Sequence, residues 1–437
     1  MSLSSRKIAL DILSDVADKG SYLNLAVKKQ LPLLKSAEDR RFAAALVSTT
    51  VQNILRIDYV TDRFIKTKRV HKVIRNILRL GVCQLMFFES VPVSAAVNES
   101  VKLAASCGKT QLKGFVNGVL RKIADSLGSI TYPDMEIETA AYLSVFYSYP
   151  RWICEKFIND FGVDFTQSLL SYTAETTLTC VRVKEELLED ADRTEVDSYL
   201  PGKYFSDARY IKNASSIEDM PLFKKGAITP QSESSMLCVH AAGIKNTDVV
   251  LDVCAAPGGK SAYAAGMCKN IIAMELHPHR VALIRNNFVR LHVMNGQAME
   301  ADGTEFRPEL EGKFDIVILD APCSALGLLY RKPDIKIHKE AEEIKSLVNL
   351  QRRLLQNCSR YVKKGGKLLY STCTINCEEN RGNAEWFLNS RDNFVADDFS
   401  ADIPLALASR IEGGFLQLFP QIDGMDGFFI ARLRRLK

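Results

Sequence analysis

The first 130 residues carry the pattern of an α-helical domain. From Arg6 to about Ala124 apolar residues recur three and four positions apart, without the alternation that is typical of a strand. The clearest segments are IALDILSDV, RFAAALVSTTVQNIL, KVIRNILRLGVCQLMFF and AAVNESVKLAA. Ser36 and Ser94 stand where helix N-caps are expected. Residues 1–130 are therefore predicted to form a compact all-α domain.

Residues 131–225 mix helical and strand-like patterns. They begin with the acidic, proline-containing stretch TYPDMEIETAA, and a helix is predicted around Trp152 to Phe161. The segments LTCVRV and YFSDARYI have the composition of short strands. We expect a small α/β module that links the parts on either side of it.

From about Gly226 to the C-terminus, apolar strands alternate with helical segments. The strands are VVLDVC, IIAMEL, FDIVILDAPC, KLLYSTC and FFIARL. This order predicts an α/β fold for 226–437, with a doubly wound, parallel, Rossmann-like sheet. Ligands of such sheets bind at the carboxyl ends of the strands, so the residues that follow each strand are the candidates for chemistry.

Charge is distributed unevenly along the 437 residues. The net charge is +5, but residues 1–130 hold 21 Lys and Arg against 10 Asp and Glu, a net +11, which leaves −6 for the rest. The densest basic run is Arg56, Arg63, Lys66, Lys68, Arg69, Lys72, Arg75 and Arg79, opposed only by Asp58 and Asp62. Such a run is either a solvated helix face or a surface that binds a polyanion, and the pattern leaves both open.

Other features of the sequence exclude several protein classes. No signal peptide and no apolar stretch of about 18 residues is present, which predicts a soluble, cytoplasmic protein without a membrane partner. The eleven cysteines lack the paired spacing of a zinc site, so we expect reduced thiols and no bound metal.

The first predicted strand of the C-terminal part ends in a glycine-rich turn, Asp252-Val-Cys254-Ala255-Ala256-Pro257-Gly258-Gly259-Lys260-Ser261. Glycines let the backbone approach a ligand, and the following helix N-terminus offers N–H groups to an anion. The turn matches neither GxGxxG nor GxxxxGK[ST]. A tight turn without any ligand remains a second interpretation of this segment alone.

Acidic residues follow the second and third predicted strands. Glu275 ends IIAME, where it is placed to bind a ribose diol, and Asp302 follows AMEA, where it would suit an adenine amino group. Each acid alone is more typical of a protein surface. Together with the glycine-rich turn they favour a nucleoside-type cofactor.

The fourth and fifth predicted strands end in cysteines. Asp320 and Cys323 follow FDIVIL, and Cys373 follows KLLYST. Free cysteines are usually buried packing residues. Two of them at the ends of adjacent parallel strands face the ligand crevice, where a thiolate can act as a nucleophile. The six histidines have no context resembling a catalytic triad.

These segments resemble a known family. DVCAAPGGKS, DAPCSALG, RKPDIK, STCT, EEN and DGFFIARL are similar to the ordered motifs of the RNA cytosine-5 methyltransferases that use S-adenosyl-L-methionine. The helical segments DILSDV, NILRLGVCQLMFF, VNESVKLA and FVNGVLRKI resemble the NusB-like domain of the Sun/RsmB branch. That branch methylates one cytosine of 16S ribosomal RNA. The resemblance covers nearly the whole chain.

The resemblance implies a role for each candidate residue. Cys254, Ala255, Ala256, Pro257, Gly258, Gly259 and Lys260 would form the cofactor loop, with Glu275 on the ribose, Asp302 on the adenine and Asp320 between cofactor and base. Cys373 would be the nucleophile that adds to C6 of cytosine, and Cys323 would assist product release. Lys260 would help to position substrate or cofactor. The sequence departs from the family pattern at Glu275 (usually Asp), Thr374 (usually Ser) and Cys377 (usually Pro), and none of these changes removes a catalytic group.

Residues 1–130 and the 131–225 module would then contact RNA, and neither DNA nor a second copy of the chain is expected as a partner. Two alternatives stay open. In the first, the chain is an enzyme that methylates a cytosine of transfer RNA or a different cytosine of ribosomal RNA. In the second, the chain is a non-catalytic RNA-binding assembly factor. Such a factor does not need Cys323 and Cys373 at neighbouring strand ends.

Overall fold

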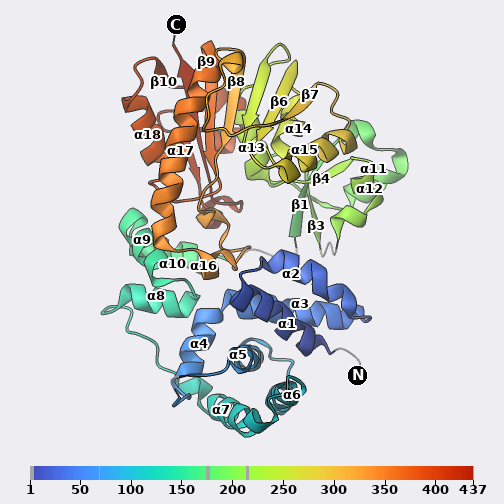
Figure 1. The fold of residues 1–437 in the computed structure, drawn as a ribbon, viewed down its shortest axis with the longest axis vertical. Coiled ribbons are helices and arrows are strands. Elements are labelled where there is room, and N and C mark those ends of the chain that lie inside the picture. Colours follow the sequence, from blue (N-terminus) through green and yellow to red (C-terminus); the bar gives the residue numbers. More distant parts are fainter. Residues whose placement is uncertain (1–3, 68, 174–177, 213–215, 437) are drawn as a thin grey trace. The chain divides into compact units, whose positions relative to one another are not determined.

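The chain forms two compact units. The computed structural model describes residues 4–67, 69–173, 178–212 and 216–436. Met1–Ser171 and Leu329–Lys339 make up the first unit, and Tyr172–Leu328 and Glu340–Lys437 make up the second (Figure 1). The predicted boundaries at 130 and 225 therefore differ from those that the contacts define.

The first unit is helical, as its sequence predicts. Its helices are α1 (Ser5–Lys19), α2 (Leu23–Gln30), α3 (Ala37–Gln52), α4 (Ile54–Asp62), α5 (Lys72–Phe87), α6 (Val93–Ser106), α7 (Lys113–Ser126), α8 (Thr139–Tyr147), α9 (Arg151–Phe161), α10 (Val163–Ser171) and the short α16 (Ile335–His338). Ser36 caps α3 by accepting from the Asp39 N–H, as expected. The prediction for Ser94 is wrong, because α6 already begins at Val93 after Pro92.

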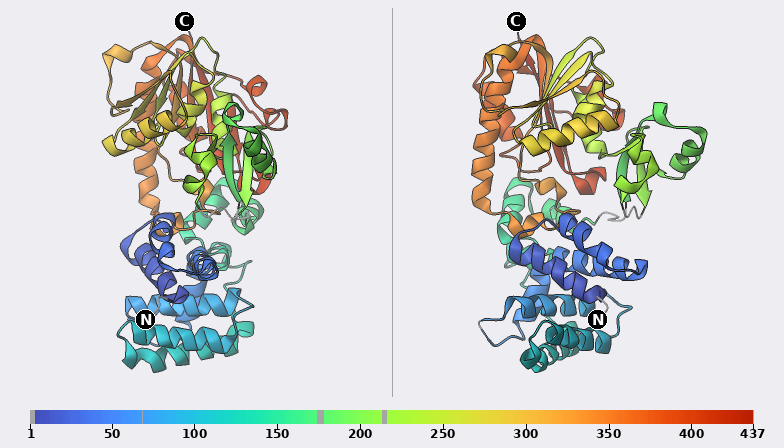
Figure 2. Two further views of the ribbon diagram at one scale, coloured as in Figure 1. Left: turned by 90° about the vertical axis from the view of Figure 1, so that its right-hand side faces the viewer. Right: turned by 45° about the vertical axis from the view of Figure 1, so that its right-hand side comes forward.

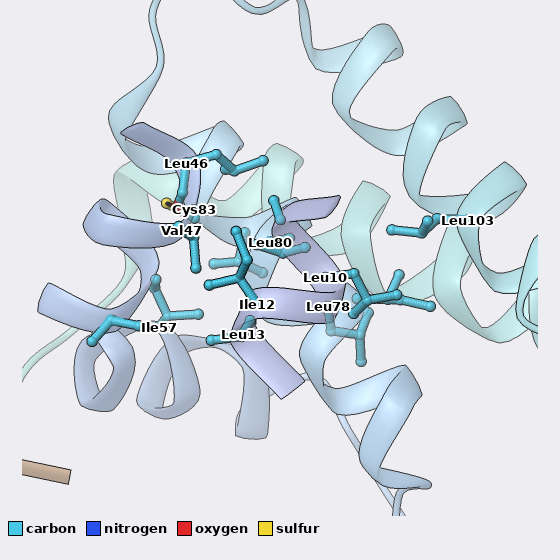
Figure 3. Packing of buried hydrophobic residues seen from close by; sticks show 14 of the residues in the cluster. Leu10, Ile12, Leu13, Leu46, Val47, Ile57, Leu78, Leu80, Cys83 and Leu103 are labelled. Atoms are coloured by element: carbon cyan, nitrogen blue, oxygen red, sulfur yellow. Dashed lines mark hydrogen bonds between the residues drawn. The ribbon is translucent and has the colours of Figure 1, made fainter. Parts of the chain in front are cut away.

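Apolar residues spaced three and four apart form one core in this unit. Figure 3 shows side chains of α1, α3, α4, α5 and α6 meeting there, among them Leu13, Leu46, Ile57 and Leu78, and each of these four is fully buried. Burying one such side chain contributes about 1.5–3 kcal/mol. The amphipathic pattern of the sequence thus accounts for the helical unit.

Helices continue past residue 130 because α8 packs against α4. The Ser148 hydroxyl at the end of α8 accepts from the Leu55 N–H at 2.9 Å. The Arg56 guanidinium lies 4.4 Å from the centre of the Phe146 ring. The first part of the predicted 131–225 module therefore belongs to the helical unit.

Much of the basic run stabilises the helical unit internally. Arg79 pairs with Asp58 at 2.6 Å, and Arg75 pairs with Asp62. Lys68 lies outside the described residues. Because Arg56, Arg75 and Arg79 already have partners, the exposed cations of this run are fewer than the sequence suggests. They include Lys66, Arg69 and Lys72.

The segment Leu329–Lys339, which contains RKPDIK, belongs to the helical unit and not to a continuous C-terminal domain. The Asp334 carboxylate accepts from the Leu23 N–H at the start of α2, at 3.0 Å. The Lys336 ammonium donates to the Gln52 carbonyl at the end of α3, at 2.6 Å. Burial lowers the pKa of Lys336 to about 7. The two charged side chains thus satisfy backbone groups that the helix ends leave open.

A small antiparallel sheet opens the second unit. Its strands β1 (Leu178–Val183), β2 (Leu200–Pro201), β3 (Ala208–Lys212) and β4 (Ile228–Pro230) have the order β2-β3-β1-β4. The predicted strands LTCVRV and YFSDARYI correspond to β1 and β3. The helices α11 (Asp190–Asp197), α12 (Pro221–Lys224) and α13 (Glu233–Ala241) follow in this region.

The large sheet has the order β10-β12-β9-β8-β5-β6-β7, with β11 paired to β12. Its strands are β5 (Val249–Val253), β6 (Asn270–Glu275), β7 (Gly296–Glu300), β8 (Phe314–Asp320), β9 (Val362–Thr372), β10 (Phe394–Ala396), β11 (Phe415–Leu418) and β12 (Phe428–Arg435). The five strands from β5 to β9 are parallel, as predicted. The FFIARL strand, β12, is antiparallel to β9, so the sheet is mixed rather than wholly parallel.

Helices cover both faces of this sheet. Besides α13, the helices of this region are α14 (Gly259–Ala265), α15 (Pro278–Arg290), α17 (Ala341–Tyr361), α18 (Arg381–Asn389), α19 (Leu405–Ala408) and α20 (Pro420–Asp423). Val250, Ile316 and Ile318 face α13 and α14, while Leu251 and Val317 face α17 and α18. The long α17 runs beside the sheet in both views of Figure 2. None of the described helices is both long and apolar enough to cross a membrane.

Candidate active site

The candidate residues of the second unit all follow strands whose carboxyl ends lie at one edge of the sheet. β5 is the central strand, with β6 and β7 on one side and β8 and β9 on the other. The strand order reverses between β5 and β8, which is where open α/β sheets bind their ligands. This arrangement separates a cofactor half (β5, β6, β7) from a thiol half (β8, β9).

The glycine-rich turn leads from β5 into α14. Cys254 and Gly258 both have positive φ, 64° and 98°. A Cβ on Gly258 would lie 3.3 Å from the backbone of Ile284, whereas a Cβ on Gly259 would meet no atom within 4 Å. The start of α14 is therefore open on one side. Burial raises the pKa of Cys254 well above its usual value, so this thiol is neutral.

Asp252, at the end of β5, is a buried acid that is only partly satisfied. Ser261 donates to its Oδ2 at 2.5 Å, while its Oδ1 is buried without a hydrogen-bond partner. Burial raises the pKa of Asp252 to about 7. A buried, unpaired carboxylate oxygen favours a positive charge nearby, whereas the open helix N-terminus beside it favours an anionic group. The sequence places Asp252 at the head of the turn, but no role was predicted for it.

Glu275 connects the turn to the end of β6. Its Oε2 accepts from the Ala256 N–H at 3.4 Å, its Oε1 accepts from the Leu276 N–H at 3.1 Å, and Arg280 lies 3.3 Å away. This buried carboxylate retains acceptor capacity for a diol. Asp302 lies beyond β7 and accepts from the N–H and the hydroxyl of Thr304.

Asp320 joins the two halves of the site. The Lys260 ammonium of α14 donates to its Oδ2 at 2.7 Å, and the Ser371 hydroxyl of β9 donates to its Oδ1 at 2.8 Å. Burial lowers the pKa of Lys260, but the charge and hydrogen bond of Asp320, together with Cys238 and Asp252, raise it overall. Lys260 is therefore a fixed positive charge and not a base.

The two predicted cysteines face each other. The Sγ atoms of Cys323 and Cys373 are 3.3 Å apart. The hydrogen bond with Cys373 and burial both raise the pKa of Cys323 well above its usual value. The raised pKa keeps Cys323 protonated.

A buried polar network, for which the sequence predicted no role, lies behind the thiols. Ser324, Thr374, Gln351, Asn376 and Glu379 are hydrogen-bonded to one another and are fully buried. The one available signal was the EEN motif, which contains Glu379. Cys377 is exposed, and among the residues described here no group of three or more His, Cys, Asp or Glu side chains is placed to hold a metal ion.

A doubly wound sheet with an open glycine-rich turn after its central strand and acids at the next strand ends defines an S-adenosylmethionine-dependent methyltransferase. Comparisons with known proteins give the family. Residues 240–434 match the family described as 16S rRNA methyltransferase RsmB/F, and residues 3–125 match the NusB family. The chain belongs to the RsmB family of small-subunit ribosomal RNA methyltransferases.

Relatives match over the full length of the chain. A probable ribosomal RNA small subunit methyltransferase B of Bacillus subtilis is 32% identical, with 99% of each chain covered. Its Synechocystis counterpart is 30% identical over 99% of this chain and 100% of its own length. The crystal structure of PH0851 matches the whole chain with a TM-score of 0.80 at 22% identity, which is a likeness of fold. A methyltransferase homologue from Pyrococcus horikoshii covers 68% of this chain and 99% of its own, with 25% identity and a TM-score of 0.55.

Proposed function

We propose that this protein transfers a methyl group from S-adenosyl-L-methionine to C5 of a cytosine in 16S ribosomal RNA, with Cys373 as the nucleophile and Cys323 assisting release. The observation that carries this proposal is the pair of sulfurs 3.3 Å apart at the ends of β8 and β9. In the proposed mechanism Cys373 attacks as a thiolate, while Cys323, whose pKa is raised by its hydrogen bond with Cys373 and by burial, stays protonated.

Two thiols solve a chemical problem. Cytosine C5 is too weak a nucleophile to take a methyl group directly. When the Cys373 thiolate adds to C6, an S–C6 bond forms and the C5=C6 electron pair shifts to C5, where it is delocalised toward C4 and N3. C5 thereby becomes nucleophilic. The bound cofactor supplies an electrophilic methyl group on a sulfonium. Removal of the C5 proton then restores C5=C6 and expels Cys373.

Cys323 is suited to take that proton only after the adduct has formed. The largest cause of its raised pKa is its hydrogen bond with Cys373. Once Cys373 becomes a neutral thioether, this cause is removed and the pKa of Cys323 falls. Cys323 would therefore stay protonated during attack. After the adduct forms it would give its proton to water, and the resulting thiolate would take the C5 proton during release.

The acids of the site divide between cofactor and base. The glycine-rich turn, Glu275 and Asp302 would hold the cofactor, and the buried, unpaired Oδ1 of Asp252 would favour a positive charge nearby. Asp320 is held by Lys260 and Ser371, and its carboxylate would orient the base by accepting from the exocyclic amine of cytosine.

The helical unit would provide the grip on RNA. It belongs to the NusB family, and Lys66, Arg69 and Lys72 are exposed cations for phosphate contacts. Because addition at C6 needs access to the face of the ring, the target base has to leave the helical stack.

Bisulfite sequencing of RNA from cells with and without the protein tests the target. We expect one 16S cytosine to be protected only when the protein is present. Protection confined to transfer RNA or another ribosomal site would support the alternative substrate. No protection at all, with RNA binding that needs no cofactor pocket, would support an assembly factor.

The covalent step has its own test. RNA with 5-fluorocytidine at the target should form a denaturant-stable adduct, because fluorine at C5 cannot leave as a proton does. Cys373→Ala should form no adduct and lose methyl transfer at least 1,000-fold (order of magnitude, from the loss of a nucleophile), with cofactor affinity unchanged within about twofold. Normal turnover by Cys373→Ala would refute the mechanism. Cys323→Ala should accumulate the adduct on ordinary RNA.

A further inference from the structure

Glu379 is a buried acid behind the two thiols, and all its hydrogen-bond partners described here are neutral. Its relative exposure is 0%. Its Oε1 accepts from the Ser324 N–H at 2.8 Å and from Gln351 Nε2 at 2.9 Å. Its Oε2 accepts from the Ser324 hydroxyl at 2.5 Å and from Asn376 Nδ2 at 2.9 Å. Four donors use the acceptor positions that a carboxylate offers.

These donors come from the loops that carry the thiols. Ser324 directly follows Cys323, and Asn376 lies in the loop that Cys373 begins. The hydroxyls of Ser324 and Thr374 are 2.8 Å apart, which links the two loops a second time. Gln351 of α17 donates to Glu379 and also to the Pro322 carbonyl at 2.9 Å. One acid therefore connects both loops and the helix beside them.

We propose that Glu379 is a positioning residue that holds the Cys323 and Cys373 loops together and thereby keeps the two sulfurs face to face. It acts through Ser324 and Asn376 and bonds to neither sulfur. Its negative charge is one further cause of the raised pKa of Cys323, after the hydrogen bond with Cys373 and burial. The geometric part of this inference is independent of the reaction, while its catalytic consequence rests on the proposed function.

The first test measures the sulfur geometry without RNA. Diamide oxidises two neighbouring thiols to a disulfide and takes up both hydrogens to become a hydrazine. In the wild-type protein a Cys323–Cys373 disulfide should form rapidly, identified by peptide mass spectrometry among the eleven cysteines. Glu379→Gln replaces one carboxylate oxygen by an NH2 group, which cannot accept from the donors that now bond to that oxygen. We therefore expect cross-linking to slow at least fivefold. The exposed neighbour provides the matched control, Glu378→Gln, which should stay within twofold of the wild type.

The second test measures catalysis by the full-length chain on 16S ribosomal RNA. For Glu379→Gln we expect kcat to fall at least tenfold, while KM for RNA and the cofactor Kd stay within twofold. Covalent protein–RNA adduct should accumulate, because a displaced Cys323 releases product slowly. Ser324→Ala removes only the hydroxyl bonds to Glu379 and Thr374, so it should give a smaller change in the same direction.

The outcomes separate the two proposals. The positioning role is refuted when Glu379→Gln and Ser324→Ala both leave cross-linking and kcat within twofold of the wild type. It is also refuted when Glu379→Gln loses cofactor binding in parallel with kcat, because that indicates general damage. Slow cross-linking in a protein whose wild type methylates no cytosine supports the positioning role and refutes the proposed function.

Discussion

Two buried acids distinguish the cofactor half of the site from the thiol half. Asp252 in the cofactor half has one donor, Ser261, and leaves Oδ1 unpaired. Glu379 in the thiol half accepts from four donors. A buried carboxylate oxygen without a hydrogen-bond partner favours a positive charge nearby, whereas an acid with all acceptor positions taken organises the protein around it. The difference indicates that the cofactor half lacks a partner that a ligand would supply, whereas the protein itself supplies every partner of the acid in the thiol half.

The titration of Asp252 should have the largest effect on stability. Its folded pKa of about 7 lies above the ordinary value of 3.8, so the folded state binds more protons than the unfolded state between these pH values. The free energy of unfolding should therefore fall as pH rises from about 4 to about 7, by up to about 4 kcal/mol. Asp252→Asn should lack this fall, as measured by urea unfolding across that range.

The same titration should appear in ligand binding. A cationic cofactor prefers ionised Asp252, so wild-type affinity should increase as pH rises through about 7, and affinity of Asp252→Asn should be weaker and flat. Glu379→Gln is the control from the other half and should keep the wild-type profile of cofactor affinity. Parallel profiles for wild type and Asp252→Asn would show that the unpaired oxygen plays no part in binding.

Asp320 tests whether the halves are coupled by charge. Asp320→Ala leaves the Lys260 ammonium without its partner at 2.7 Å, and we expect unfolding free energy to decrease by about 3 kcal/mol. Adding Lys260→Met should recover most of this loss, which a double-mutant cycle measures. The exposed pair Lys102 and Glu99 is the matched control, with an expected effect below about 1 kcal/mol for Glu99→Ala. Additive effects of Asp320→Ala and Lys260→Met would contradict the coupling.

Gly258→Ala should have the smallest effect and should be confined to the cofactor half. Its φ of 98° is unfavourable for alanine, with an expected cost of about 1–2 kcal/mol. Cofactor affinity, measured by calorimetry, should fall about tenfold. The diamide cross-linking rate of Cys323 and Cys373 should not change. Gly266→Ala, at the other end of α14 with negative φ, serves as control. A slower cross-linking rate in Gly258→Ala would show that the halves are not independent.

The strand ends were predictable because their signals are local. Apolar runs followed by Gly258, Glu275 or Cys373 place those residues at one edge of a parallel sheet without knowledge of any contact. The cofactor half uses interactions near in sequence, such as Glu275 with Leu276. The antiparallel direction of β12 was missed because its apolar run reads the same in either direction.

The thiol half depended on contacts between distant residues. Ser324 and Glu379 are 55 positions apart, and the hydrophobic periodicity of neither segment indicates the hydrogen bond between them. The Leu329–Lys339 segment is a second case, since Asp334 and Leu23 are 311 positions apart. Charge counting likewise missed that Arg75 and Arg79 pair with acids of α4.

The sequence by itself determined the helices, the strands and the identity of the groups at the strand ends, because hydrophobic periodicity and glycine conformation act within a few residues. Only the tertiary structure decided which of these groups are satisfied. Asp252 keeps an unpaired oxygen and Glu379 does not, and that depends on which donors the packed chain brings within 3 Å of each carboxylate. Burial makes this difference matter, because an unpaired acid in a low-dielectric interior costs free energy that a nearby positive charge offsets. A fully paired acid has no such cost.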